Sequence, residues 1–184
     1  MAHKGQIISD EFTIMEFLET SEDTDGKYSK ILVTFKPGSF KAVDHIHLFQ
    51  DETFRVRSGI LTYKLDGITN KISSGEEITL PKGKPHTHFN DEKYDLITEQ
   101  IISPALDVEY LLETIFGFAG EGKIKKGKIP FFQVMLWLKY LKAKTYLASL
   151  PISVQDFLSS VTAPIARKKG YQIAYKRFSG TDVL

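Results

Sequence analysis

Four of the five histidines lie in two short segments, the pattern with the clearest chemical meaning in the chain. They are His45, His47, His86 and His88. Glu52 follows the first pair closely, and a Pro81-Lys82-Gly83 turn precedes the second. Three imidazoles and one carboxylate, once folded together, form a mixed nitrogen and oxygen site that suits a divalent transition metal. The sequence therefore predicts a metal centre, while it leaves the substrate open.

Strand geometry explains how these side chains could reach one cavity. Side chains alternate between the two faces of a strand, so His45 and His47 point the same way. Residues 48–51 can turn the chain, and Glu52 would then begin a neighbouring strand and face the two imidazoles. His86 is the natural third imidazole, and His88 shares its parity. Only one of this second pair need bind the metal; the other could line the pocket, orient a ligand or move protons.

The first half of the chain has the periodicity of a β-structure. Its β-branched and aromatic runs cover residues 31–35, 54–56, 60–65, 78–80 and 94–102. Glycine and proline turns separate these runs at short, regular intervals. This pattern predicts an antiparallel sandwich or a small barrel.

After Pro104 the apolar residues recur at three and four, which is typical of helices. The first helix should end between Gly117 and Gly122. A second should begin at Pro130 and reach about Ser149; it is apolar nearly all round and should be covered on more than one side. A core position is favoured for it over contact with a membrane surface. A third should follow Ser153 as N-cap and run to about residue 169.

Composition limits the possible partners. The 24 Lys and Arg residues nearly balance the 23 Asp and Glu residues, so the net charge of +1 favours a small-molecule substrate and no nucleic acid. The absence of cysteine excludes disulfides and thiolate ligands. Residues 1–12 lack a secretory pattern, which predicts a cytoplasmic location. The apolar run at residues 131–141 is shorter than the ~20 residues needed to span a bilayer, so no stable membrane insertion is expected.

The segments around the histidines resemble the two signatures of the cupin superfamily. The first is Gly38, His45-Ile46-His47, Glu52 and Gly59, and the second is Gly75, Pro81-Lys82-Gly83, His86 and Asn90. Six residues separate Gly38 from His45, where the family usually has five. We expect the extra residue to lengthen the loop without moving the ligands.

The resemblance implies a mainly β fold, a cupin double-stranded β-helix or jelly-roll barrel. The barrel would span residues 1–103, and a C-terminal helical segment of two to three helices would cover residues 104–184 and pack on it. This extension has no counterpart in a minimal cupin, so it could cap the barrel mouth, cover an edge strand or form a dimer contact. We expect the chain to be a homodimer.

The resemblance also implies that His45, His47, Glu52 and His86 bind one divalent ion, which could be Fe, Mn, Ni, Zn or Cu. Such a shell retains open positions, as catalytic metals do. The favoured function is a dioxygenase-like oxidoreductase acting on an enol, phenolic or diketone substrate, with His88 as the catalytic acid or base. The alternatives are a metal-dependent isomerase and a non-catalytic ligand-binding or sensing cupin.

The predicted pocket is partly aromatic. Parity on the flanking strands favours Phe49 and Phe54 as its lining, with Phe40 as a third candidate, although core packing explains these positions equally well. On the last predicted strand either Glu99 or Gln100 could project inward. The sequence alone does not decide between these two.

Overall fold

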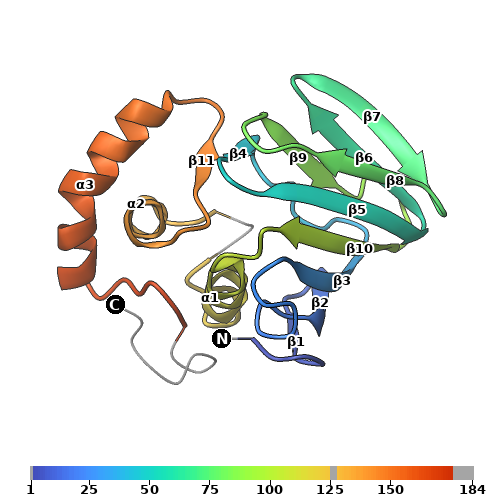
Figure 1. The fold of residues 1–184 in the computed structure, drawn as a ribbon, viewed down its shortest axis with the longest axis horizontal. Helices are drawn as coiled ribbons and strands as arrows, with labels where there is room; N and C mark the ends of the chain where they lie inside the picture. The colour runs from blue at the N-terminus through green and yellow to red at the C-terminus, as the bar shows by residue number, and fades with distance from the viewer. Residues whose placement is uncertain (1, 125–127, 176–184) are drawn as a thin grey trace.

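Two antiparallel sheets form the body of the protein (Figure 1). The structure is a computed structural model, and it describes residues 2–124 and 128–175. One sheet has the strand order β1-β2-β3-β10-β5-β8 and the other the order β11-β4-β9-β6-β7. The strands are β1 (Ile7–Ser9), β2 (Thr13–Glu19), β3 (Ser29–Phe35), β4 (His45–His47), β5 (Asp51–Ser58), β6 (Ile60–Leu65), β7 (Ile68–Ser73), β8 (Glu77–Leu80), β9 (His86–Phe89), β10 (Leu96–Ser103) and β11 (Thr145–Leu147). The mainly β prediction is confirmed.

Alternating burial along the strands builds the core between the sheets. In β5, Phe54 and Val56 are buried together with Glu52, whereas Arg55 and Arg57 are exposed, which confirms the predicted parity. The main core also takes apolar residues from the other strands, including Phe17, Ile31, Val33, Leu61, Leu80 and Leu96. Because strand β5 lies inside its sheet between β10 and β8, its inward face is fixed on both sides.

A glycine is required at the turn between β5 and β6. Gly59 has a φ of +88°, a left-handed conformation that residues with a side chain rarely adopt. A Cβ at this position would lie 2.7 Å from the carbonyl oxygen of Asp95. Gly59, the last glycine of the first signature, therefore permits the turn that joins β5 to β6.

Three helices follow the barrel strands, as predicted. They are α1 (Val108–Gly120), α2 (Phe131–Tyr140) and α3 (Ile152–Lys168). Helix α2 lies between α3 and the barrel (Figure 1), and Leu136 and Trp137 pack with Ala163 and Ala166 of α3. The expectation that the second helix is covered on more than one side is confirmed. Among the described helices, none combines the length and hydrophobicity that crossing a membrane requires.

Two details of the predicted helices are wrong. The second helix, expected to reach Ser149, ends at Tyr140, and β11 follows it and pairs with β4. The edge of β4 offers unpaired backbone groups, and a Thr-Tyr-Leu segment fits a pleated edge, so tertiary pairing overrides the helical pattern here. The third helix begins at Ile152 after Pro151 as N-cap, so Ser153 lies inside it.

Helix α1 is tied to the N-terminal strands by buried carboxylates. Glu109 accepts hydrogen bonds from the backbone and hydroxyl of Ser21 and from the hydroxyl of Ser29. Glu113 accepts one from the side-chain amide of Gln6 at 2.9 Å. Both carboxylates are 1% exposed. These bonds place α1 beside the barrel, where Phe116 joins the main core.

Candidate metal centre

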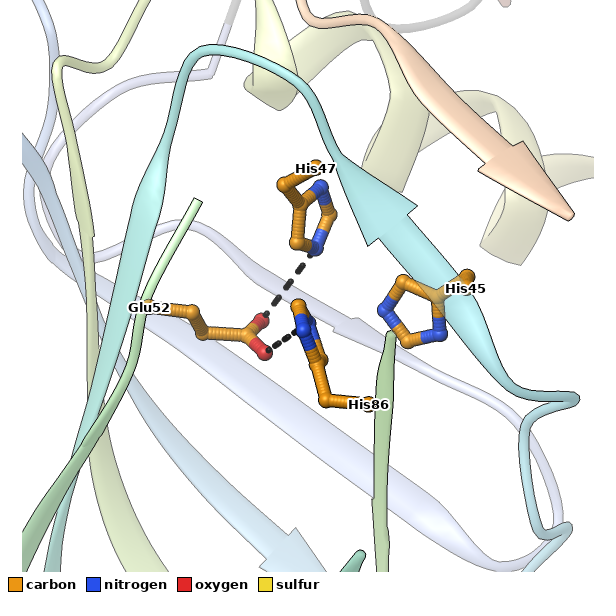
Figure 2. Close-up of side chains that lie close together, drawn as sticks. All are labelled: His45, His47, Glu52 and His86. Atoms are coloured by element: carbon orange, nitrogen blue, oxygen red, sulfur yellow. Dashed lines mark ion pairs between the residues drawn. The ribbon is translucent and has the colours of Figure 1, made fainter. Parts of the chain in front are cut away.

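Three strands bring four potential ligands to one point inside the barrel. Strand β4 carries His45 and His47, β5 carries Glu52, and β9 carries His86. The pairing of β4 with β9 sets His45 opposite His86. One donor atom from each of the four residues lies within 4.8 Å of the others. Figure 2 shows the three rings and the carboxylate pointing toward one another. The structure therefore brings together the four residues that the sequence singled out.

Hydrogen bonds on the outer side of the rings orient them. His45 Nδ1 lies 2.9 Å from the carbonyl oxygen of Val43, and His86 Nδ1 lies 2.8 Å from that of Lys84. A carbonyl can only accept, so Nδ1 carries the proton in both rings and a neutral ring keeps Nε2 as a free donor to a metal. His47 Nδ1 lies 3.1 Å from the hydroxyl oxygen of Thr145. The carbonyl partners thus leave Nε2 available in His45 and His86, and the hydroxyl of Thr145 allows the same tautomer in His47.

The carboxylate lies close to two of these nitrogens. Glu52 Oε1 is 3.9 Å from His47 Nε2, and Oε2 is 3.6 Å from His86 Nε2 (Figure 2). Burial alone raises the pKa of Glu52, but the imidazoles, His88 foremost, lower it, and the net direction is downward. Burial lowers the pKa of His45, and it lowers the pKa of His47 to about 3. The donor set at neutral pH therefore includes an ionised carboxylate and two neutral imidazoles.

His86 differs from the other two imidazoles in its proton affinity. Burial lowers its pKa, but the nearby carboxylate of Glu52 raises it, and the net direction is upward. His86 is therefore the imidazole that gains most from a nearby negative charge. A metal ion would compete with a proton for this Nε2, which makes metal binding pH-dependent.

Unpaired buried atoms test whether a metal fits this site. Among the described residues, Glu52 Oε2 and His86 Nε2 are buried without a hydrogen-bond partner. Leaving such an atom unsatisfied costs ~1–3 kcal/mol, and more for a charged group. A cation between these atoms would satisfy both, and the set of three imidazoles and one carboxylate suits Fe, Mn, Ni, Zn or Cu. The residues present therefore fit a divalent metal ion.

The comparisons with known proteins agree with this arrangement. The family model described as "Cupin domain" matches residues 31–98, which include the four clustered residues. Residues 31–98 of the chain thus match a cupin domain. None of the curated proteins matches the chain significantly.

Solved structures resemble the chain over about half of its length. A sugar phosphate isomerase of the cupin superfamily from Silicibacter pomeroyi has 20% sequence identity and a TM-score of 0.44, and the match covers 50% of this chain and 60% of that protein. KdgF from Halomonas sp. has 15% identity and a TM-score of 0.48, over 56% and 90% of the two chains. A predicted oxalate decarboxylase from Thermotoga maritima has 20% identity and a TM-score of 0.49, over 55% and 92%. The chain thus spans less than two thirds of the Silicibacter protein.

His88 lies beside the four clustered residues of the cupin domain. Its Nδ1 is 3.6 Å from Glu52 Oε2, and its ring centroid is 4.4 Å from that of Phe54 and 5.7 Å from that of Phe35. Burial lowers the pKa of His88 to about 4. The ring lines the cavity at the metal centre. His88 is therefore a neutral, pocket-lining imidazole in contact range of the carboxylate.

The side chain of Gln100, rather than that of Glu99, projects from β10 into the cavity. Its amide nitrogen donates to Glu52 Oε1 at 2.5 Å. Glu99 points to the other face and accepts a hydrogen bond from Arg57. The structure thus decides between the two alternatives, and it shows that Gln100 fixes the carboxylate of Glu52.

A cavity of about 260 Å³ lies beside the four clustered residues, and the C-terminal extension forms much of its wall. Leu111 of α1, Trp137 of α2 and Thr145 of β11 line it together with the barrel residues His45 and His47. Of the three proposed roles for the extension, two are observed, because it caps the barrel mouth and β11 covers the edge of β4.

The aromatic lining differs from the prediction. Phe40 lines the cavity, and Phe54 is fully buried behind His88. The prediction for Phe49 is wrong, since its side chain is 50% exposed and does not line the cavity. The strand ends at His47 and the chain bends at residues 48–49, so alternation no longer determines where Phe49 points.

Thr145 could not be identified from the sequence as a partner of the site. Its contact with His47 depends on the pairing of β11 with β4, which sets Thr145 opposite His47. A three-residue strand within an apolar segment has no strong local signal. For the apolar residues of α1 and α2 that line the cavity, the sequence predicted helices but not their contact with the site.

Proposed function

We propose that the protein is a metal-dependent cupin enzyme whose His45, His47, Glu52 and His86 bind one divalent transition metal ion. The observation that carries the proposal is the convergence of three imidazoles and a buried carboxylate at a cavity, with the rings of His45 and His86 oriented by backbone carbonyls. A structural metal would not need such a cavity beside it. The substrate is a small molecule that enters the cavity and reaches the metal.

We further propose that the reaction is the oxidation by dioxygen of an enol, phenolic or diketone substrate. When bound, the metal would supply Lewis acidity to a substrate oxygen and, if redox-active, electrons for dioxygen chemistry. His88 is the proposed catalytic base and would accept the hydroxyl proton at Nδ1, which is buried and unpaired among the described residues. Gln100 holds Glu52 in place through its amide, and the apolar walls exclude water.

Metal analysis tests the ligand assignment. Protein grown with defined metals is analysed for bound metal in the wild type and in His47→Ala and His86→Ala. Each variant should lose most of the bound metal, because it removes one of the four donors. His3→Ala is the matched control, since His3 is exposed and outside the cluster. Unchanged metal content in both cluster variants would reject the assignment.

Turnover separates the proposed reaction from its alternatives. Oxygen uptake and product formation are followed with catechol and acetylacetone, using protein loaded in turn with Fe(II), Mn(II), Ni(II), Cu(II) or Zn(II). A dioxygenase consumes oxygen with a redox-active ion and not with zinc, whereas an isomerase converts its substrate with zinc as well. A binding or sensing module binds tightly without product. His88→Gln should keep the metal and lose most turnover; full turnover in this variant would refute its catalytic role.

We propose that the barrel, residues 1–103, and the extension, residues 104–184, contribute different parts of the site. The barrel would supply the metal ligands, and the extension would supply most of the apolar cavity wall. This division is supported by the origin of the cavity-lining side chains. A cytoplasmic location and the absence of nucleic-acid binding remain predictions from the sequence.

We also propose a homodimer formed through α3. Val154, Phe157, Val161 and Ile165 are exposed and recur at three and four residues along this helix. Such a row is self-complementary about a twofold axis when two copies pack antiparallel. That packing would also set the basic C-terminal turn of one helix near Asp156 of the other. A second copy of the chain is therefore the occupant that this face fits.

A further inference from the structure

The cavity at the metal centre is polar at one end only, and this asymmetry restricts the ligand. We propose that it binds a compact molecule with one oxygen-bearing, metal-binding head and an apolar alkyl or aryl body. This inference rests on the proposed metal-dependent function and adds the substrate class to it. A sugar, a sugar phosphate or a ligand with a second charge would not fit.

The free polar atoms lie at the metal end. Among the described residues that line the cavity, His88 Nδ1 and Gln100 Oε1 are buried and lack a hydrogen-bond partner, and neither residue is a proposed metal ligand. A substrate head that carries a hydroxyl or an enol can donate to these acceptors. The head group is therefore directed to this end by hydrogen bonding as well as by the metal.

The polar side chains that the extension contributes to the cavity wall have partners within the protein. Trp137 Nε1 donates to the carbonyl oxygen of Ile173 at 3.2 Å. The hydroxyl of Tyr146 donates to Asp156 at 2.7 Å. The hydroxyl of Thr145 is the partner of His47. These residues therefore present carbon to the ligand, as do Leu111, Leu112, Ile115, Val134 and Leu138 beside them.

The cavity also lacks a counterion for a second anionic group. Among the described residues that line it, none is lysine or arginine. Lys144 lies in the same segment as Thr145, but its ammonium donates to the carbonyl oxygen of Leu138. A phosphate or a second carboxylate in the apolar part would be buried without compensation, which is strongly unfavourable. Each hydroxyl of a polyol would meet the same wall at a cost of ~1–3 kcal/mol.

The volume sets the size of the apolar body. The cavity holds about 260 Å³. At ~30 Å³ per water molecule in the liquid, this is room for roughly nine water-sized groups. A head group with a tail of about six carbons, or with one aromatic ring, would fill it. A longer tail would extend out of the cavity, where added methylenes gain no further burial.

Two series of probes with increasing tail length test this inference. Alkyl hydroxamates from acetohydroxamic to octanohydroxamic acid are titrated into metal-loaded protein, because the hydroxamate head binds divalent ions. The 1-alkanols from ethanol to octanol are titrated into the metal-free protein. Fluorescence of Trp137 reports both series, since it is the only tryptophan of the chain and lines the cavity.

Affinity should increase about fourfold for each added methylene in both series, and it should level off at roughly six carbons. Placing a hydroxyl at the tail end of hexanohydroxamic acid should weaken binding at least about tenfold. Val134→Phe, which fills the cavity from α2, should weaken the long probes much more than the short ones. Ile68→Phe is the matched control, because Ile68 is 66% exposed on β7 and does not line the cavity.

Affinity that is independent of tail length, or equal binding of the hydroxylated tail, would overturn the inference. The two series separate its failure from that of the proposed function. Suppose that the protein binds no metal but that alkanol affinity still increases with each methylene. This result would support the apolar cavity and reject the metal centre. A protein that binds metal and hydroxamate heads without any tail dependence would retain the metal centre and reject the apolar ligand class.

Discussion

Substitution of Thr145 by valine should weaken metal binding without touching any proposed ligand. The hydroxyl of Thr145 lies 3.1 Å from His47 Nδ1 and accepts its proton when Nε2 faces the metal. Valine keeps the β-branched shape, so the pairing of Thr145 with His47 along β11 and β4 should persist. What is lost is the group that fixes the tautomer and the orientation of one ligand ring.

The size of the effect follows from the environment of this hydrogen bond. A neutral hydrogen bond contributes ~0.5–1.5 kcal/mol, and a buried donor left without an acceptor costs ~1–3 kcal/mol. His47 is 6% exposed, but Thr145 is only partly buried, so water can replace part of the lost bond. We therefore expect a loss of ~1.4 kcal/mol, which is about tenfold in metal affinity. This lies at the low end of the ~10–100-fold range for such supporting groups.

Competition with a chelator of known affinity measures the effect with Zn(II) or Co(II). Thr145→Ser retains the hydroxyl and should bind metal nearly as tightly as the wild type. Thr69→Val is the matched control, because Thr69 is exposed on β7. Thermal unfolding of the metal-free proteins shows whether the fold is intact. Equal metal affinity in Thr145→Val and Thr145→Ser would refute the reasoning.

Three further predictions concern stability and assembly. Glu109→Ala removes the acceptor that Ser21 and Ser29 share, and urea unfolding should show a loss of ~3 kcal/mol, against less than ~0.5 kcal/mol for an exposed carboxylate. Burial raises the pKa of Glu113 above its unfolded value, so ionisation of this carboxyl opposes folding. The wild type should therefore lose stability relative to Glu113→Gln as pH rises from 5 to 8. A difference in melting temperature that stays constant over this range would contradict the prediction. Phe157→Lys, at a side chain that is 68% exposed on α3, should convert a dimer to a monomer in light scattering, whereas a wild type that is already monomeric would reject the dimer.

The barrel and its ligand cluster could be predicted because local patterns determine them. Alternation along β5 fixes which side Glu52 faces, and its burial with Phe54 matches the expected parity. The turn at Gly59 could be placed because the glycine stands between two strand patterns in the sequence. The positive φ of this turn explains why the residue is glycine. In such segments local preference and tertiary structure agree, and the sequence is then sufficient.

Prediction failed where a long-range contact decides the local structure. Residues 145–147 form a strand only because the edge of β4 is available to them, and nothing local distinguishes them from the end of a helix. Phe49 follows two residues of correct parity, but a bend separates it from their strand and exposes it. The alternative at Glu99 and Gln100 was open for a similar reason, because a single strand does not reveal which of its faces is inward.

The extension adds two separable contributions to one site, and this separation can be tested on neighbouring elements. Thr145 on β11 contacts the ring of the proposed ligand His47, whereas Val134 on α2 lines the cavity and packs against the cluster of Met135, Leu138 and Tyr146. Substitutions at the first position should change metal affinity and leave the preference for tail length, and substitutions at the second should do the reverse. A substitution at Val134 that changed metal affinity as strongly as one at Thr145 would mean that the extension acts through the stability of the whole barrel. The distinct effects would instead establish that barrel and extension form one site with two independently adjustable parts.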